Sequence, residues 1–97
     1  MQHGVFDSAY AWVMNNPDVA PAFVAAKVGY DVWLGNSRGN TFSRKHTSLD
    51  PDTDGLEYWG TDWTDMGGKD LPAVFDYLLK ETNNEKLAYI GHSQGTT

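Results

Sequence analysis

A serine flanked by two glycines near the end of the sequence constrains the fold most. Residues 91–95 read G-H-S-Q-G and fit the pattern G-x-S-x-G, in which a serine lies on a sharp turn between a strand and a helix. The apolar residues 86–90 directly before the motif predict that strand. Because the serine of such a turn has a strained backbone, the glycines predict close backbone packing on both sides of Ser93.

The segments before this motif alternate between strand and helix patterns. Residues 2–6 are typical of the end of a strand that runs into a loop, and residues 30–34 are rich in β-branched and aromatic side chains. Between them, residues 21–28 predict a short helix, with a proline in its first turn and Gly29 just beyond its end. The order predicts an α/β fold with a parallel sheet, as a βαβαβ fragment that ends at the serine turn.

A longer helix is predicted before the last strand. Asp62 is a good N-cap, and Asp65, three residues later, completes an approximate capping box. The glycines at 67–68 and Pro72 weaken the helix interior and predict a kink or a restart near Asp70, whose carboxylate could cap the restarted helix. The residues at helical spacing that predict its buried face are Leu71, Phe75, Leu78, Leu79 and Thr82.

Composition excludes several classes of function. The net charge is −6, with 13 acidic residues against 7 basic ones, so the chain lacks the basic surface that nucleic-acid binding requires. There is no cysteine for a disulfide or a thiolate metal site. The alternating carboxylates at 50–54 lack the glycine and glutamate of a calcium loop, so no metal site is predicted. No transmembrane segment and no signal peptide are found in the sequence.

The start of the sequence supplies a second candidate functional element. His3 and Gly4 are followed by the apolar residue Val5. A His-Gly pair before an apolar residue recurs where hydrolases place a backbone N–H of the oxyanion hole. The dipeptide is a weak signal by itself and gains weight from the serine motif.

Taken together, these stretches resemble the acid lipase family, which includes gastric and lysosomal acid lipases. The similarity covers nearly the whole chain, and residues 29–40 are its most specific part. The matching stretches are 2–4, 29–40, 43–46, 50–52, 70–73 and 89–97.

The resemblance implies a partial α/β-hydrolase fold, with residues 1–97 as the incomplete N-terminal part of a lipase domain. It implies a serine esterase that hydrolyses neutral lipid esters, triacylglycerols or steryl esters, at a lipid–water interface. Ser93 corresponds to the nucleophile, and the backbone N–H groups of Gln94 and Val5 correspond to the oxyanion donors. The family usually has leucine where Val5 stands. No cofactor or metal is implied, the location is secreted or lysosomal, and protein partners are not predicted.

One departure from the family pattern concerns the catalytic triad. In α/β-hydrolases the Asp or Glu and the His follow the serine along the chain, and only two residues follow the motif here. The 97 residues alone are therefore expected to be inactive, or nearly so, because a serine without its base is a poor nucleophile. The alternatives are a non-catalytic truncated relative that binds lipid or a protein, and a thioesterase of the same fold. Epoxide hydrolases, which have Asp at the nucleophile position, are disfavoured.

Overall fold

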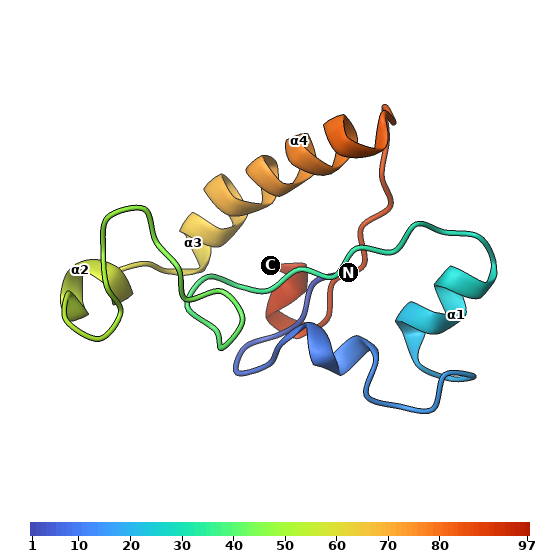
Figure 1. Ribbon diagram of the computed structural model, residues 1–97, viewed down its shortest axis with the longest axis horizontal. Coiled ribbons are helices and arrows are strands. Elements are labelled where there is room, and N and C mark those ends of the chain that lie inside the picture. The colour runs from blue at the N-terminus through green and yellow to red at the C-terminus, as the bar shows by residue number, and fades with distance from the viewer. The chain divides into compact units, whose positions relative to one another are not determined.

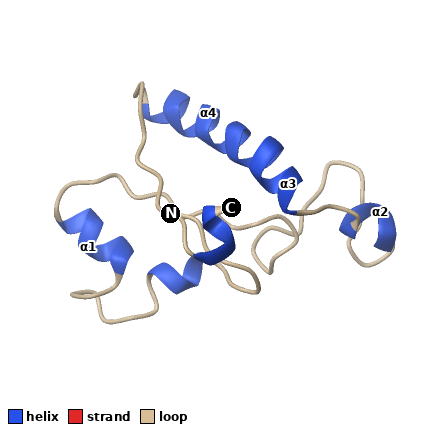
Figure 2. Ribbon diagram, turned by 180° about the vertical axis from the view of Figure 1, so that it is seen from behind, coloured by secondary structure: helices blue, strands red, loops and turns tan.

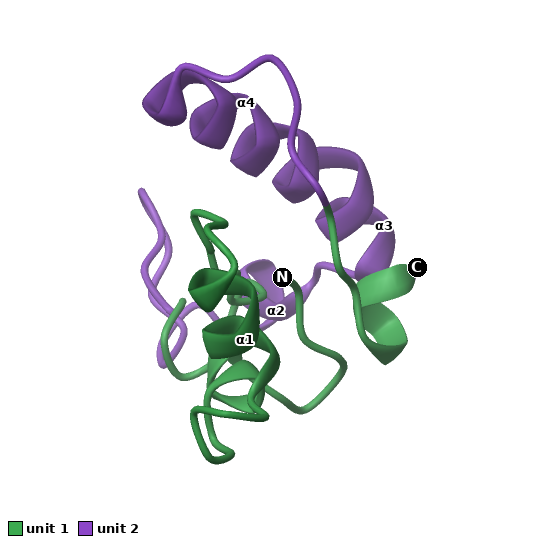
Figure 3. Cartoon of the chain, turned by 90° about the vertical axis from the view of Figure 1, so that its right-hand side faces the viewer, with its two compact units in different colours: residues 1–43, 89–96 green, residues 44–88, 97 purple.

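The computed structural model describes residues 1–97, which form two compact units (Figure 3). Unit 1 consists of Met1–Ser43 and Tyr89–Thr96, and unit 2 consists of Arg44–Ala88 and Thr97. The serine motif and the His-Gly pair therefore both belong to unit 1, which contains every residue predicted to act in catalysis.

Unit 1 contains three short helices (Figure 1): η1 (Ala9–Trp12), α1 (Pro21–Lys27) and η3 (Ser93–Thr96). The Ser8 hydroxyl caps η1 by accepting a hydrogen bond from the N–H of Tyr10 at 3.2 Å. Helix α1 starts at the proline, whose fixed φ suits a first turn, and Gly29 follows its end with φ +101°. The predicted helix 21–28 is thereby confirmed to within one residue.

Three extended segments of unit 1 lie in parallel register around Gln2. Isolated parallel bridges join Gln2 to Gly35 on one side and to Gly91 on the other. The N–H of Gln2 donates to the carbonyl of Ile90 at 2.8 Å, and the N–H of His92 donates to the carbonyl of Gln2 at 3.1 Å. The segment that contains Gln2 is therefore the middle one. The segment that ends at Gly35 lies on one side of it, and the segment that ends at Gly91 lies on the other.

The strands predicted at 30–34 and 86–90 do not form, and the parallel βαβαβ sheet is not present (Figure 2). A parallel ladder needs several consecutive residues of neighbouring strands to pair. Here the middle segment enters a turn at Val5, three residues after Gln2, and each neighbouring segment forms a single bridge to it. The three segments therefore lie parallel to one another, as predicted for the sheet, but they do not form continuous strands.

Unit 1 has a small core, which is formed by Trp12 at the end of η1, Ala20 just before α1 and Ala22 in the first turn of α1. Ala20 is fully buried, and Ala22 and Trp12 are nearly so. His3 is the buried polar residue of this core, with 3% of its surface exposed. A buried imidazole requires hydrogen-bond partners, which makes its surroundings informative about the site.

Unit 2 contains the short helix α2 (Gly55–Trp59) and a nearly continuous helical run. This run consists of α3 (Trp63–Asp65), the π-helical segment η2 (Met66–Asp70) and α4 (Leu71–Thr82). It ends at Asn83, which has the left-handed conformation common at helix C-termini, with φ +52°. None of the helices in the structure is both long enough and apolar enough to cross a membrane.

The predicted capping box at the start of α3 is confirmed. The Asp62 carboxylate accepts hydrogen bonds from the N–H groups of Thr64 and Asp65 at 2.8 and 3.3 Å, and the Asp65 carboxylate accepts one from the N–H of Asp62. Hydrogen bonds from the Thr64 hydroxyl and from the Thr64 and Asp65 N–H groups hold the pKa of Asp62 below its usual value. The ionised form of Asp62 is therefore the one that stabilises the helix.

The predicted irregularity near Asp70 is present, but its form differs. The glycine pair lies in the π-helical segment, and the chain stays helical through Asp70, with φ −71° and ψ −48°. The prediction that Asp70 caps a restarted helix is wrong, because its side chain makes no capping hydrogen bond. A residue inside a helical run has no row of unpaired N–H groups to cap.

The predicted inner face of α4 is its least exposed side. The half-buried residues of this helix are the five expected from helical spacing, namely Leu71, Phe75, Leu78, Leu79 and Thr82, and every other residue of α4 is exposed. None of them is fully buried. The apolar periodicity thus identifies the face correctly, while the helix has little packed against it.

Replacing Asp62 tests the capping box. We expect Asp62→Ala to speed hydrogen exchange of the Thr64 and Asp65 amides, because both lose their acceptor. A lowered folded-state pKa makes the carboxylate's stabilisation fully present above the unfolded value of about 3.9 and lost as the pH falls through the folded value. Helical circular dichroism should therefore fall at low pH more steeply in the wild type than in Asp62→Ala. Asp76→Ala, at an exposed position of α4, serves as the control, and equal pH profiles for all three proteins would contradict the capping role.

Candidate functional site

Ser93 has a left-handed backbone conformation, which agrees with the strained backbone predicted for the serine of the motif. Its φ is +53°, a value that L-residues seldom adopt. Such a conformation costs about 1–3 kcal/mol and persists only where neighbouring structure holds it. The residue opens η3, directly after the Gly91 bridge, so the chain turns sharply from an extended segment into a helical turn.

Both glycines of the motif are required by close backbone contacts. A Cβ on Gly95 would lie 2.5 Å from the carbonyl oxygen of Gln2 and 2.7 Å from that of His3. A Cβ on Gly91 would collide with the carbonyl of Gly95. Real Cβ atoms do not approach other atoms this closely, so the expectation of tightly packed backbone on both sides of Ser93 is confirmed.

The His-Gly pair lies directly against the serine. A Cβ on Gly4 would be 2.9 Å from the Ser93 Cβ and 3.4 Å from its hydroxyl oxygen. This contact follows from the register described above, in which the first segment and the motif are paired through Gln2. Two stretches separated by almost 90 residues in the sequence therefore meet at one point of unit 1.

The two backbone groups predicted as oxyanion donors flank this point. Val5 follows Gly4 in an exposed turn, and no hydrogen bond joins its N–H to another group of the chain. Gln94 follows Ser93 in the first turn of η3, where backbone N–H groups have no acceptor within the helix. Val5 and Gln94 therefore directly follow the two residues that are in contact, Gly4 and Ser93, and their N–H groups can donate hydrogen bonds to an anionic oxygen.

Comparison with known proteins identifies the family of the chain. The family model described as alpha/beta hydrolase fold matches residues 1–97. The chain belongs to the α/β-hydrolase fold family. Gastric triacylglycerol lipase of Mus musculus is 50% identical to it and that of Homo sapiens is 47% identical, in each case over all 97 residues, which make up 24% of either relative.

A third relative extends the similarity to insects. Lipase 1 of Drosophila melanogaster is 50% identical over the same 97 residues, which cover 22% of its length. The chain spans about a quarter of the length of the curated relatives it matches. The predicted resemblance to this group of lipases is confirmed at the level of sequence similarity.

None of the three histidines of this α/β-hydrolase chain serves as a base for Ser93 in the structure. The ring of His3 is bonded to Gly4 and to the loop at 37–40. His46 lies in unit 2, where its Nδ1 accepts hydrogen bonds from two backbone N–H groups of its own loop. His92 directly precedes Ser93, and its side chain is exposed. No hydrogen bond joins an imidazole to the Ser93 hydroxyl.

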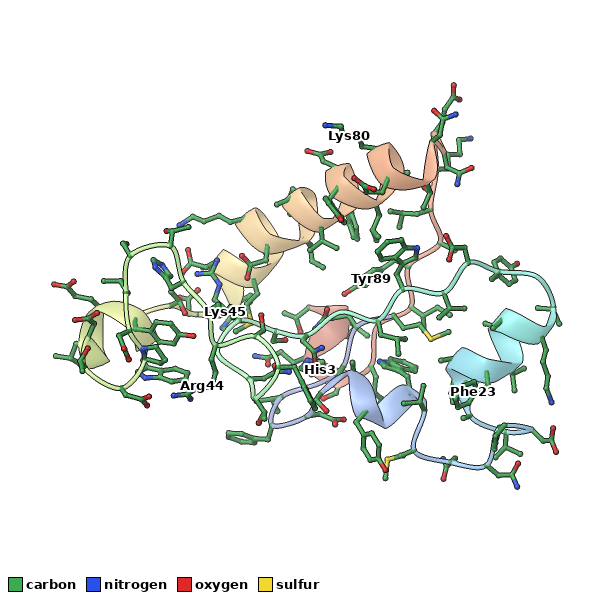
Figure 4. All side chains as sticks on the ribbon, viewed as in Figure 1. His3, Phe23, Arg44, Lys45, Lys80 and Tyr89 are labelled. Atoms are coloured by element: carbon green, nitrogen blue, oxygen red, sulfur yellow. The ribbon has the colours of Figure 1, made fainter.

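Tyr89 supports the serine turn, and the sequence analysis did not identify it. Its hydroxyl donates a hydrogen bond to the carbonyl of Gly95 at 2.6 Å (Figure 4). Burial raises the pKa of the Tyr89 hydroxyl, which favours the protonated form that can donate. In the sequence, only the position of Tyr89 four residues before the serine could have indicated this role, and the G-x-S-x-G pattern does not include that position.

The close contact at Gly95 predicts a large effect of one added methyl group. We expect Gly95→Ala to lower the free energy of unfolding by about 1–3 kcal/mol, the usual cost of overpacking, because its Cβ would overlap two carbonyl oxygens. Gly67→Ala is the matched control, since its Cβ would meet nothing within 4 Å; it should raise the free energy of unfolding by about 0.5–1 kcal/mol. Urea denaturation measures both, and equal effects of the two substitutions would contradict the packing described.

Proposed function

We propose that the protein is a carboxylic ester hydrolase of neutral lipids that works through an acyl-enzyme on Ser93. The observation that carries this proposal is the left-handed serine turn packed directly against Gly4. The names of the similar relatives, which are triacylglycerol lipases and other lipases, support the class of substrate. Triacylglycerols or steryl esters at a lipid–water interface are the proposed substrates.

The proposed mechanism is acyl transfer. The Ser93 hydroxyl attacks the ester carbonyl while a histidine takes its proton, and an acidic residue orients that histidine. The N–H groups of Val5 and Gln94 stabilise the oxyanion of the tetrahedral intermediate. Losing one such donor typically lowers kcat by about 10²–10³-fold. Water then hydrolyses the acyl-enzyme, and the reaction requires no metal or cofactor.

The base and the acid of this mechanism are proposed to lie in sequence that follows Thr97. The observation that supports an incomplete domain is the small core. Only three hydrophobic side chains are buried, whereas nineteen large ones are exposed, and soluble monomeric proteins rarely expose so much apolar surface. In the complete domain these side chains would be covered by further sheet and helices. Residues 1–97 are thus proposed to be the N-terminal part of a lipase domain.

The proposed location is outside the cell or in the lysosome, by analogy with the lipase family. Gastric triacylglycerol lipases are among the similar relatives, and their name associates them with the stomach. A fluorescent protein fused to the C-terminus of the complete protein would show the location. Retention in the cytosol would contradict this part of the proposal.

Replacing Ser93 in the complete protein tests the proposed nucleophile. We expect Ser93→Ala to lower kcat for hydrolysis of emulsified triolein by about 10⁴-fold or more, because the reaction loses its covalent route. Ser48→Ala, in a loop of unit 2, should leave the rate unchanged. Titration of released fatty acid measures the rate. Undiminished activity of Ser93→Ala would show that another group performs the attack.

The 97 residues alone should not react as a serine hydrolase. We expect a fluorophosphonate probe to label Ser93 in the complete protein and to leave the isolated chain unlabelled, because no imidazole is bonded to its hydroxyl. In-gel fluorescence of the two proteins at equal concentration measures the difference. Labelling of the isolated chain at a comparable rate would overturn this expectation. Absence of labelling in both proteins would favour the non-catalytic alternative.

A further inference from the structure

His3 is buried next to the serine turn, but its ring takes no part in the proposed proton transfer. Only 3% of its surface is exposed, and both ring nitrogens have hydrogen-bond partners. Nδ1 lies 2.7 Å from the carbonyl oxygen of Gly4. Nε2 accepts a hydrogen bond from the N–H of Ser37 at 3.0 Å, and Asn40 Nδ2 lies 3.2 Å from it.

These partners require one tautomer of the His3 ring. A backbone N–H can only donate, so Nε2 must be the unprotonated nitrogen that accepts from Ser37. A carbonyl oxygen can only accept, so Nδ1 must carry the proton that it shares with Gly4. The ring is therefore a fixed donor toward Gly4, with its other nitrogen held by the loop at 37–40.

Asn40 and Asn36 make this arrangement unambiguous. The Oδ1 of Asn40 accepts from the N–H of Phe42 at 3.0 Å, so the Asn40 NH₂ group faces His3 and Asn36. The Oδ1 of Asn36 in turn accepts from that NH₂ group and from the N–H of Ala9, both at 2.9 Å. Because each amide is anchored by a backbone N–H, no side chain in the network can flip without losing a bond.

The carbonyl that His3 binds belongs to the same peptide unit as the N–H of Val5. The peptide group is planar, so fixing the direction of the Gly4 carbonyl fixes the opposite direction of the Val5 N–H. Gly4 has no side chain to restrict its rotation, and Val5 is exposed in a turn. The bond to the carbonyl also polarises the peptide, which strengthens its N–H as a donor.

We propose that His3 is a positioning residue that orients the Gly4–Val5 peptide and so sets the Val5 N–H as an oxyanion donor. This inference rests on the proposed ester hydrolysis by Ser93. The Asn36–Asn40 loop acts through His3, since it holds Nε2 and leaves Nδ1–H for the Gly4 carbonyl. The histidine touches neither the substrate nor the transferred proton.

Two substitutions in the complete protein separate the two ring nitrogens. His3→Asn places an amide NH₂ where Nδ1–H was and keeps the donor to Gly4. His3→Gln places an amide oxygen near the position of Nε2, which keeps the acceptor for Ser37 but loses the donor to Gly4. We expect His3→Gln to lower kcat on a soluble ester such as p-nitrophenyl butyrate by about 10–100-fold with KM unchanged, as for a misplaced oxyanion donor, and His3→Asn to stay within about threefold of the wild type.

Crystal structures of the two variants provide a measurement that does not depend on activity. The Gly4–Val5 peptide should rotate in His3→Gln and keep its orientation in His3→Asn. Equal kcat values for the two variants, or an unmoved peptide in His3→Gln, would overturn the positioning role. If the wild type hydrolyses no ester, the proposed function fails, and the peptide orientation still decides whether His3 sets it.

The wild-type protein offers a second test in case His3→Gln does not fold. Nitrogen-15 NMR of the labelled imidazole ring distinguishes the two neutral tautomers. Protonation at Nδ1 of His3 is the expected result. Protonation at Nε2 would leave the Gly4 carbonyl without its donor and would overturn the inference.

Discussion

Direct contact between backbone segments holds the serine turn to the start of the chain. Gly95 packs on the carbonyls of Gln2 and His3, and Gly4 packs on Ser93, at distances that leave no space for a side chain. The strain of a left-handed serine can persist because these contacts and the hydrogen bonds of Gln2 fix the turn on both sides. The turn therefore forms even though no continuous sheet supports it.

The buried hydrogen-bond network around His3 in unit 1 sets the orientation of the peptide that lies against the serine turn. A buried imidazole destabilises a small core unless its nitrogens are bonded, and here every bond has a defined donor and acceptor. Satisfying His3 fixes the Gly4 carbonyl, and fixing that carbonyl fixes the next N–H. Stability and site geometry thus depend on the same few hydrogen bonds.

Most of the predictions that depend on interactions between residues close in sequence are confirmed. The proline start and glycine end of α1, the capping box at Asp62 and the inner face of α4 depend on neighbours within a few residues, and all are present. The strands predicted at 30–34 and 86–90 are absent, because a strand needs a partner along its whole length and here only single bridges form. Asp70 failed as a cap because the chain stays helical through it.

The sequence by itself determined the serine turn, since G-x-S-x-G permits a strained serine with backbone packed on either side. It also determined the family, through a similarity that extends over all 97 residues. Only the tertiary structure decided which peptide meets the serine, which nitrogen of His3 carries the proton, and that Tyr89 supports Gly95. These contacts join segments whose distance along the chain gives no pattern, or depend on side-chain geometry that a motif does not encode.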